Sequence, residues 1–156
     1  MGKKDLARLW IRWKNGSTDN IYFVKKLYLD VDGVLLTLKN TRIADFSIPF
    51  IHFITKRFDC YWLTTHCKGN IGSVIAYLSE YFDAAIIEQL AVIKPTNWQT
   101  LKTEAIDFST NFYWIDDYPL QAEFEVLKKH DVTNKLVIVD LSKFGELNRI
   151  IDFLQP

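Results

Sequence analysis

The chain has 156 residues, 49% of them hydrophobic and 15% aromatic, and its 19 basic side chains balance 19 acidic ones. These values predict a single domain over residues 1–156 and exclude a disordered chain. The zero net charge excludes a strongly basic nucleic-acid binder. No apolar run approaches the roughly 20 residues of a membrane-spanning helix, and charges interrupt the N-terminus, so we expect no membrane contact and a cytoplasmic location.

The first 26 residues form an extension with a basic and aromatic character. Five basic side chains against one acidic side chain give residues 1–14 a charge of +4. Trp10 and Trp13 lie among these charges, a mixture that can hold a nucleic-acid strand by phosphate contacts and base stacking. The alternative, which we favour, is an edge strand or short helix whose tryptophans pack on the domain. Residues 15–20 predict a turn that joins a hairpin.

Short apolar runs alternate with segments of helical periodicity along the rest of the chain. A proline opens two of these segments, and Thr96 with Gln99 predicts a capping box for a third. The alternation predicts an α/β fold, a doubly wound and mainly parallel sheet with helices on both faces. Strands are expected at 27–29, 61–63, 112–115 and 136–139, and helices at about 47–58, 70–82, 96–106, 119–130 and 143–154.

Polar residues follow the strands of this predicted sheet. Because ligands of doubly wound sheets bind beyond the carboxyl ends of the strands, these residues are the candidate site. Val34 and Thr41 stand where a calcium-binding loop needs an oxygen ligand and a glutamate, so calcium is excluded. The candidates are Asp30 and Asp32 after the first strand, Thr64 and Thr65 after the second, Lys94 further on, and Asp116 and Asp117 after the third.

Asp30 and Asp32 form the most informative pair of these residues. Side chains alternate along an extended strand, so both carboxylates are expected to project to the same side. That arrangement suits a nucleophile and a general acid. Gly33 follows them, where the backbone turns sharply or approaches a ligand closely.

Residues 27–35, with the sequence LYLDVDGVL, resemble the first motif of the haloacid dehalogenase (HAD) superfamily of phosphohydrolases. Residues 61–64 look like its second motif, an apolar strand ending in threonine, and Lys94 looks like its third. Residues 114–117 look like the fourth, an apolar strand ending in paired acids. The resemblance covers about residues 27–154 and implies a Rossmann-like core.

The resemblance also implies an activity, a Mg²⁺-dependent phosphatase that works through an aspartyl phosphate. Asp30 would be the nucleophile, and Asp32 the general acid and then the general base. Either Thr64 or Thr65 would bind the phosphate together with Lys94. Mg²⁺ would be held by Asp30, the backbone carbonyl of Asp32, Asp116 and Asp117.

The intervals between the motifs leave no room for a cap domain. Thirty residues separate Gly33 from Thr64, and 29 separate Thr64 from Lys94. An open site favours a phosphorylated substrate that is itself large, such as the end of a nucleic acid. The alternative is a noncatalytic module of the same fold that binds phosphate or nucleic acid. His66 and Cys67 lie beside the second motif and are given no catalytic role.

Overall fold

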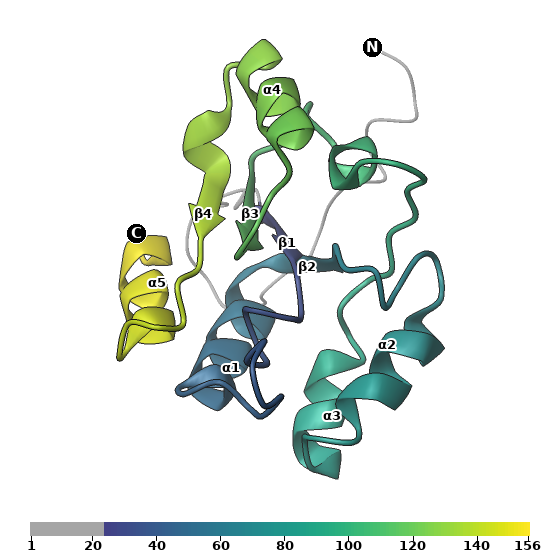
Figure 1. Cartoon of the computed structure of the whole chain (residues 1–156), viewed down its shortest axis with the longest axis vertical. Helices are drawn as coiled ribbons and strands as arrows, with labels where there is room; N and C mark the ends of the chain where they lie inside the picture. Colours follow the sequence, from purple (N-terminus) through teal and green to yellow (C-terminus); the bar gives the residue numbers. More distant parts are fainter. Residues whose placement is uncertain (1–23) are drawn as a thin grey trace, which may run out of the picture.

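The computed structural model describes residues 24–156, so the predicted hairpin and the segment with Trp10 and Trp13 lie outside the described residues. Four parallel strands form one sheet in the order β2-β1-β3-β4 (Figure 1). The strands are β1 (Lys26–Leu29), β2 (Asp59–Trp62), β3 (Phe112–Asp116) and β4 (Leu136–Ile138). The helices are α1 (Ser47–Arg57), α2 (Ile71–Leu78), α3 (Ala84–Leu90), α4 (Gln121–Lys129) and α5 (Glu146–Leu154), with short 3-10 helices η2 (Lys102–Ala105) and η3 (Thr133–Lys135).

The strand order places a switch point beside β1. The chain leaves β1 for β2 on one side and returns to pair β3 on the other side, with Leu29 opposite both Trp62 and Ile115. Ligands of doubly wound sheets bind where the order of strands reverses in this way. The predicted α/β fold is confirmed, and the ends of β1 and β3 flank its expected binding point.

Each face of the sheet has its own core. Leu27 and Leu29 point to the face covered by α1, α2, α3 and α5, whereas Tyr28 points to the other face with Trp114 and Leu127 of α4. These five side chains are at most 2% exposed. The alternation of side chains along β1 and β3 therefore assigns even-numbered residues to the α4 face. Asp30 and Asp116 are also even-numbered and lie at the carboxyl ends of β1 and β3, so they belong to the α4 face.

One expected helix is wrong, and one helix of the structure was not expected. The segment 96–106 is a loop with a single 3-10 turn, because the Thr96 hydroxyl donates to the Trp62 carbonyl at 2.5 Å and caps no helix. The Glu104 carboxylate instead accepts hydrogen bonds from three successive backbone amides of this loop. Helix α3 was not expected, although Asp83 caps it by accepting from the Ile86 amide at 3.0 Å.

The other helices begin and end within a few residues of the predicted positions. Between residues 24 and 156, none of the helices has the length and apolar character needed to span a bilayer.

Candidate active site

Asp30 and Asp116 meet at the switch point of the sheet. The Asp30 amide donates to the Ile115 carbonyl at 3.1 Å, which ties the end of β1 to the end of β3. Asp30 is 8% exposed and Asp116 is fully buried. The Asp116 carboxylate is oriented by the indole of Trp114 and the amide of Tyr118, each donating at 3.0 Å. Two acidic groups are thus held in a poorly hydrated place, which a purely structural pair seldom needs.

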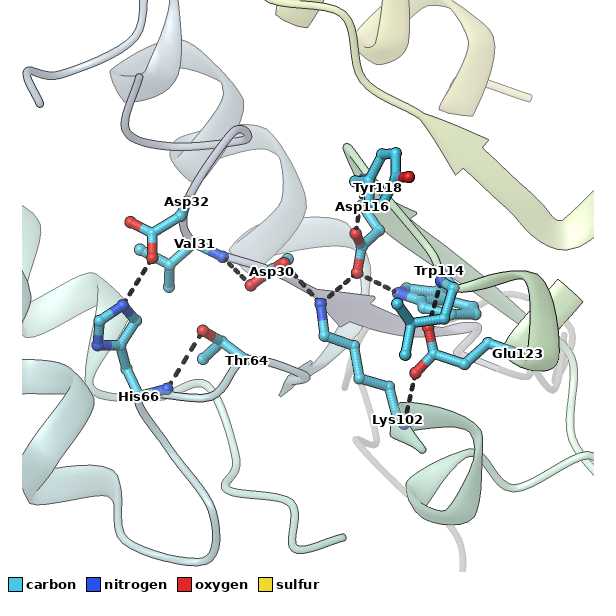
Figure 2. A network of polar contacts seen from close by, with 11 residues as sticks. Asp30, Val31, Asp32, Thr64, His66, Lys102, Trp114, Asp116, Tyr118 and Glu123 are labelled. Atoms are coloured by element: carbon cyan, nitrogen blue, oxygen red, sulfur yellow. Dashed lines mark hydrogen bonds and ion pairs between the residues drawn. The ribbon is translucent and has the colours of Figure 1, made fainter. Parts of the chain in front are cut away.

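Lys102 bridges these two carboxylates (Figure 2). Its Nζ lies 2.6 Å from an oxygen of Asp30 and 2.6 Å from an oxygen of Asp116. The backbone of Lys102 is fixed by Glu123, whose buried carboxylate accepts from the Lys102 amide at 2.7 Å and from the Leu120 amide at 2.8 Å. Helix α4 therefore positions η2, and η2 presents the ammonium to the acids.

The electrostatics of this cluster follow from burial and crowding of like charges. Burial, followed by the charge of Asp116, raises the pKa of Asp30 from its ordinary 3.8 to about 6, although Lys102 opposes the shift. Burial also opposes the charge of Lys102, but the two carboxylates outweigh it and raise the pKa of Lys102. Burial and the neighbouring Asp116 raise the pKa of Asp117. The single positive charge of Lys102 does not fully offset the negative charges of Asp30, Asp116 and Asp117.

Asp117 completes a group of oxygens that could hold a metal ion. Carboxylate oxygens of Asp30, Asp116 and Asp117 lie within 4.8 Å of one another. Gly33 has a φ of +75° and makes room for this group, because a Cβ at Gly33 would lie 2.2 Å from Cγ of Asp117. An all-oxygen set of carboxylates fits a hard divalent cation such as Mg²⁺.

Thr64 and Thr65 differ in their surroundings. Thr64 is 1% exposed and follows Leu63, whose amide donates to the Leu29 carbonyl at 2.8 Å next to Asp30. The Thr64 hydroxyl accepts from the His66 amide at 3.4 Å and so can donate its own proton elsewhere. Thr65 is exposed. Of the two, Thr64 is the one placed beside the end of β1.

Asp32 lies on the same rim but has different partners from Asp30. One of its oxygens is 2.7 Å from Nε2 of His66, and the other accepts from the hydroxyl of Tyr77 at 3.0 Å. In Figure 2 the Asp32 carboxylate points toward His66, whereas Asp30 points toward Lys102. Burial, followed by the hydrogen bond to Asp32, raises the pKa of Tyr77, which therefore stays a hydrogen-bond donor.

The structure does not bring Lys94 to the acids, which corrects the expected lysine. The backbone of Lys94 pairs with Tyr61 beside β2, and its Nζ lies 2.6 Å from Asp59, the first residue of that strand. Lys102 instead lies beside Asp30, where an ammonium was expected. No local pattern in the sequence points to Lys102, whose ammonium reaches the Asp116 carboxylate across 14 residues.

Comparisons with protein-family models, with curated proteins and with solved structures each found no match for this chain.

Proposed function

We propose that this protein is a Mg²⁺-dependent phosphohydrolase of the HAD type, which cleaves phosphate monoesters through an aspartyl phosphate. The observation that carries the proposal is the buried group formed by Asp30, Asp116 and Lys102 at the switch point of the sheet, with Asp117 completing the oxygen set. The acidic positions are those that the first and fourth sequence motifs indicate. A buried carboxyl group whose pKa is raised by burial and by a neighbouring acid is typical of functional sites.

Asp30 is the proposed nucleophile. One of its oxygens attacks the phosphorus, a bond from phosphorus to Asp30 forms, and the bond to the leaving oxygen breaks while Asp32 donates a proton to that oxygen. Water then attacks the phosphorus and gives its proton to Asp32. The bond to Asp30 breaks, inorganic phosphate leaves, and both carboxyl groups return to their starting states.

Lys102 and Thr64 are the proposed phosphate ligands. The ammonium of Lys102 already lies 2.6 Å from Asp30 and would screen the repulsion between this carboxylate and an anionic substrate. Thr64 has a buried hydroxyl at the neighbouring strand end.

Asp30, Asp116, Asp117 and the backbone carbonyl of Asp32 would hold Mg²⁺. When bound, the ion would supply positive charge that stabilises the phosphoryl oxygens. The carboxylates provide the hard oxygen ligands that Mg²⁺ prefers.

The proposed substrate is a phosphate carried on a larger molecule, with a nucleic-acid end as one candidate. Support comes from the 37 residues between Thr64 and Lys102, which hold α2, α3 and their loops and no inserted cap domain. The exposed ring of Tyr118 lies directly after the acids and is available to a large substrate. Cleavage of a 5′- or 3′-phosphorylated oligonucleotide faster than cleavage of its mononucleotide would support this preference.

The test of the activity is a panel of phosphate monoesters assayed with Mg²⁺ and with EDTA, using the wild type and Asp30→Asn. The amide keeps the shape of the side chain but is not a competent nucleophile. A loss by a factor of about 10⁴ is expected, equivalent to about 5.5 kcal/mol of transition-state stabilisation. Acid-quenched wild type should also carry a phosphoryl group that hydroxylamine removes, and Asp30→Asn should carry none.

Asp59→Asn is the matched control, because Asp59 also pairs with a lysine but at the other end of the sheet. Its activity should stay near that of the wild type. A wild type that is inactive on the whole panel, while still binding phosphate or an oligonucleotide, would replace the enzyme with a noncatalytic binding module.

A further inference from the structure

The Asp32 carboxylate has two side-chain partners, His66 and Tyr77. Its side chain is 37% exposed and lies on the loop after β1, where the backbone turns at Gly33. A partly exposed carboxylate on a loop would ordinarily sample several rotamers. Here His66 contacts one oxygen at 2.7 Å and the Tyr77 hydroxyl donates to the other at 3.0 Å. The two contacts come from different elements, the loop after β2 and helix α2.

These partners also support each other. The rings of His66 and Tyr77 stack with centroids 3.9 Å apart and planes 10° from parallel. Tyr81, in the turn that follows α2, contacts the Tyr77 ring edge-on with the ring centroids 5.6 Å apart. The stack limits the rotation of both rings, so the atoms that meet Asp32 are held in fixed directions.

Resting on the proposed function, we propose that His66 and Tyr77 are positioning residues that hold the Asp32 carboxyl group for proton transfer to the leaving oxygen. Partly exposed polar contacts of this kind contribute little to stability, so stabilising the loop does not account for two dedicated partners. Orientation does account for them, because a general acid acts only within hydrogen-bond reach of the atom that it protonates. Asp30 needs no such pair, since Lys102 and the Val31 amide already hold it.

The proposal makes a prediction that depends on the leaving group. An alkoxide needs a proton as it leaves, whereas p-nitrophenolate leaves readily without one. Loss of orientation at Asp32 should therefore slow the cleavage of an alkyl phosphate and have little effect on p-nitrophenyl phosphate. A general loss of folding or of metal binding would slow both substrates equally.

The experiment measures kcat/KM for 2-glycerophosphate and p-nitrophenyl phosphate with the full chain and Mg²⁺. Tyr77→Phe removes one hydroxyl and keeps the stack, and His66→Phe removes the ring nitrogens and keeps an aromatic ring. Each variant should lose about tenfold or more on 2-glycerophosphate and less than about threefold on p-nitrophenyl phosphate. His66→Gln, whose amide can donate to Asp32, should recover part of the loss.

Two matched controls lie away from the rim. His130 stacks on Phe108 with the same 3.9 Å spacing, so His130→Phe repeats the change of His66 without Asp32. Tyr113→Phe removes a hydroxyl from a tyrosine of β3 that packs on the opposite face of the sheet from Asp116. Both controls should keep the ratio of the two kcat/KM values.

A double variant tests whether Tyr77 acts on the reaction through Asp32. In an Asp32→Asn background, adding Tyr77→Phe should cause no further loss, because the group that Tyr77 positions is already inactive. Additive losses, or equal losses on both substrates, would overturn the positioning role while leaving the phosphatase intact. A wild type that cleaves neither substrate and no other monoester of the panel would overturn the proposed function itself.

Discussion

Two clusters of lysine and aspartate lie at opposite ends of the same sheet. At the amino ends of the strands, Lys26 pairs with Asp107 at 2.9 Å and Lys94 pairs with Asp59 at 2.6 Å. These four side chains are 20–55% exposed. At the carboxyl ends, Lys102 contacts Asp30 and Asp116 at equal distances of 2.6 Å, and none of these three is more than 13% exposed.

The difference lies in the balance of charge as well as in burial. Each lysine at the amino end is matched with one aspartate, and such exposed pairs add little to stability. At the carboxyl end, three neighbouring carboxylates share one ammonium, which leaves two negative charges in a poorly hydrated place when all are ionised. A concentration of uncompensated buried charge costs stability. The proposed metal ion would offset this cost by adding positive charge beside the three carboxylates.

The sharpest test of this comparison replaces the two lysines. Lys102→Met should lower kcat/KM by between about a hundredfold and a thousandfold, because a donor aimed at the reacting phosphoryl group is lost. Lys94→Met should stay within about twofold of the wild type, since its ammonium lies on Asp59. Steady-state kinetics on one phosphate monoester measure both. A larger loss of kcat/KM in Lys94→Met than in Lys102→Met would show that Lys94, the lysine expected from the sequence, binds the phosphate.

A second test uses the stability of the metal-free protein. The raised pKa of Asp30 means that ionising this group costs free energy in the folded state; the cost is absent below about pH 4 and is reached in full above about pH 6. Asp30→Asn should therefore unfold less readily than the wild type at pH 7 in EDTA, by up to about 3 kcal/mol. The advantage should vanish near pH 4.

Urea unfolding followed by circular dichroism measures this difference. Added Mg²⁺ should reduce the difference at pH 7, because the ion binds the folded wild type in preference to the variant. Asp107→Asn should change the stability in the opposite direction from Asp30→Asn, because hydrogen bonds from Ser109 and Lys26 lower the pKa of Asp107 to about 2. That variant should show its full loss of stability relative to the wild type above about pH 4, and the loss should fade as the pH falls to about 2. Equal pH dependence of stability in all three proteins would contradict the contrast between the two ends.

The smallest expected effect concerns metal affinity. Asp116→Asn keeps the size of the side chain but removes the charge of one proposed ligand, so Mg²⁺ should bind about tenfold more weakly or worse. Asp59→Asn should leave the affinity unchanged. Isothermal titration of Mg²⁺ into each protein measures both constants, and equal affinities would remove Asp116 from the metal site.

Local patterns in the sequence predicted most of the elements. Runs such as residues 27–29 and 112–115 form strands because their apolar side chains are buried on both faces of a parallel sheet. The same patterns failed for residues 96–106, where Thr96 and Glu104 have hydrogen-bond partners that a helix would not give them. Local propensity was overridden there by the Trp62 carbonyl, 34 residues away.

The sequence by itself determined the α/β fold and the positions of Asp30, Asp116 and Asp117, because the end of a strand can be read from neighbouring residues alone. Only the tertiary structure decided which lysine reaches these acids. Lys102 lies 72 residues from Asp30, and its place depends on Glu123 of α4 holding η2 against the sheet. It also decided that His66 and Tyr77 meet Asp32, across 34 and 45 residues. Such contacts arise from the packing of whole elements, so they cannot be predicted from the spacing of residues along the chain.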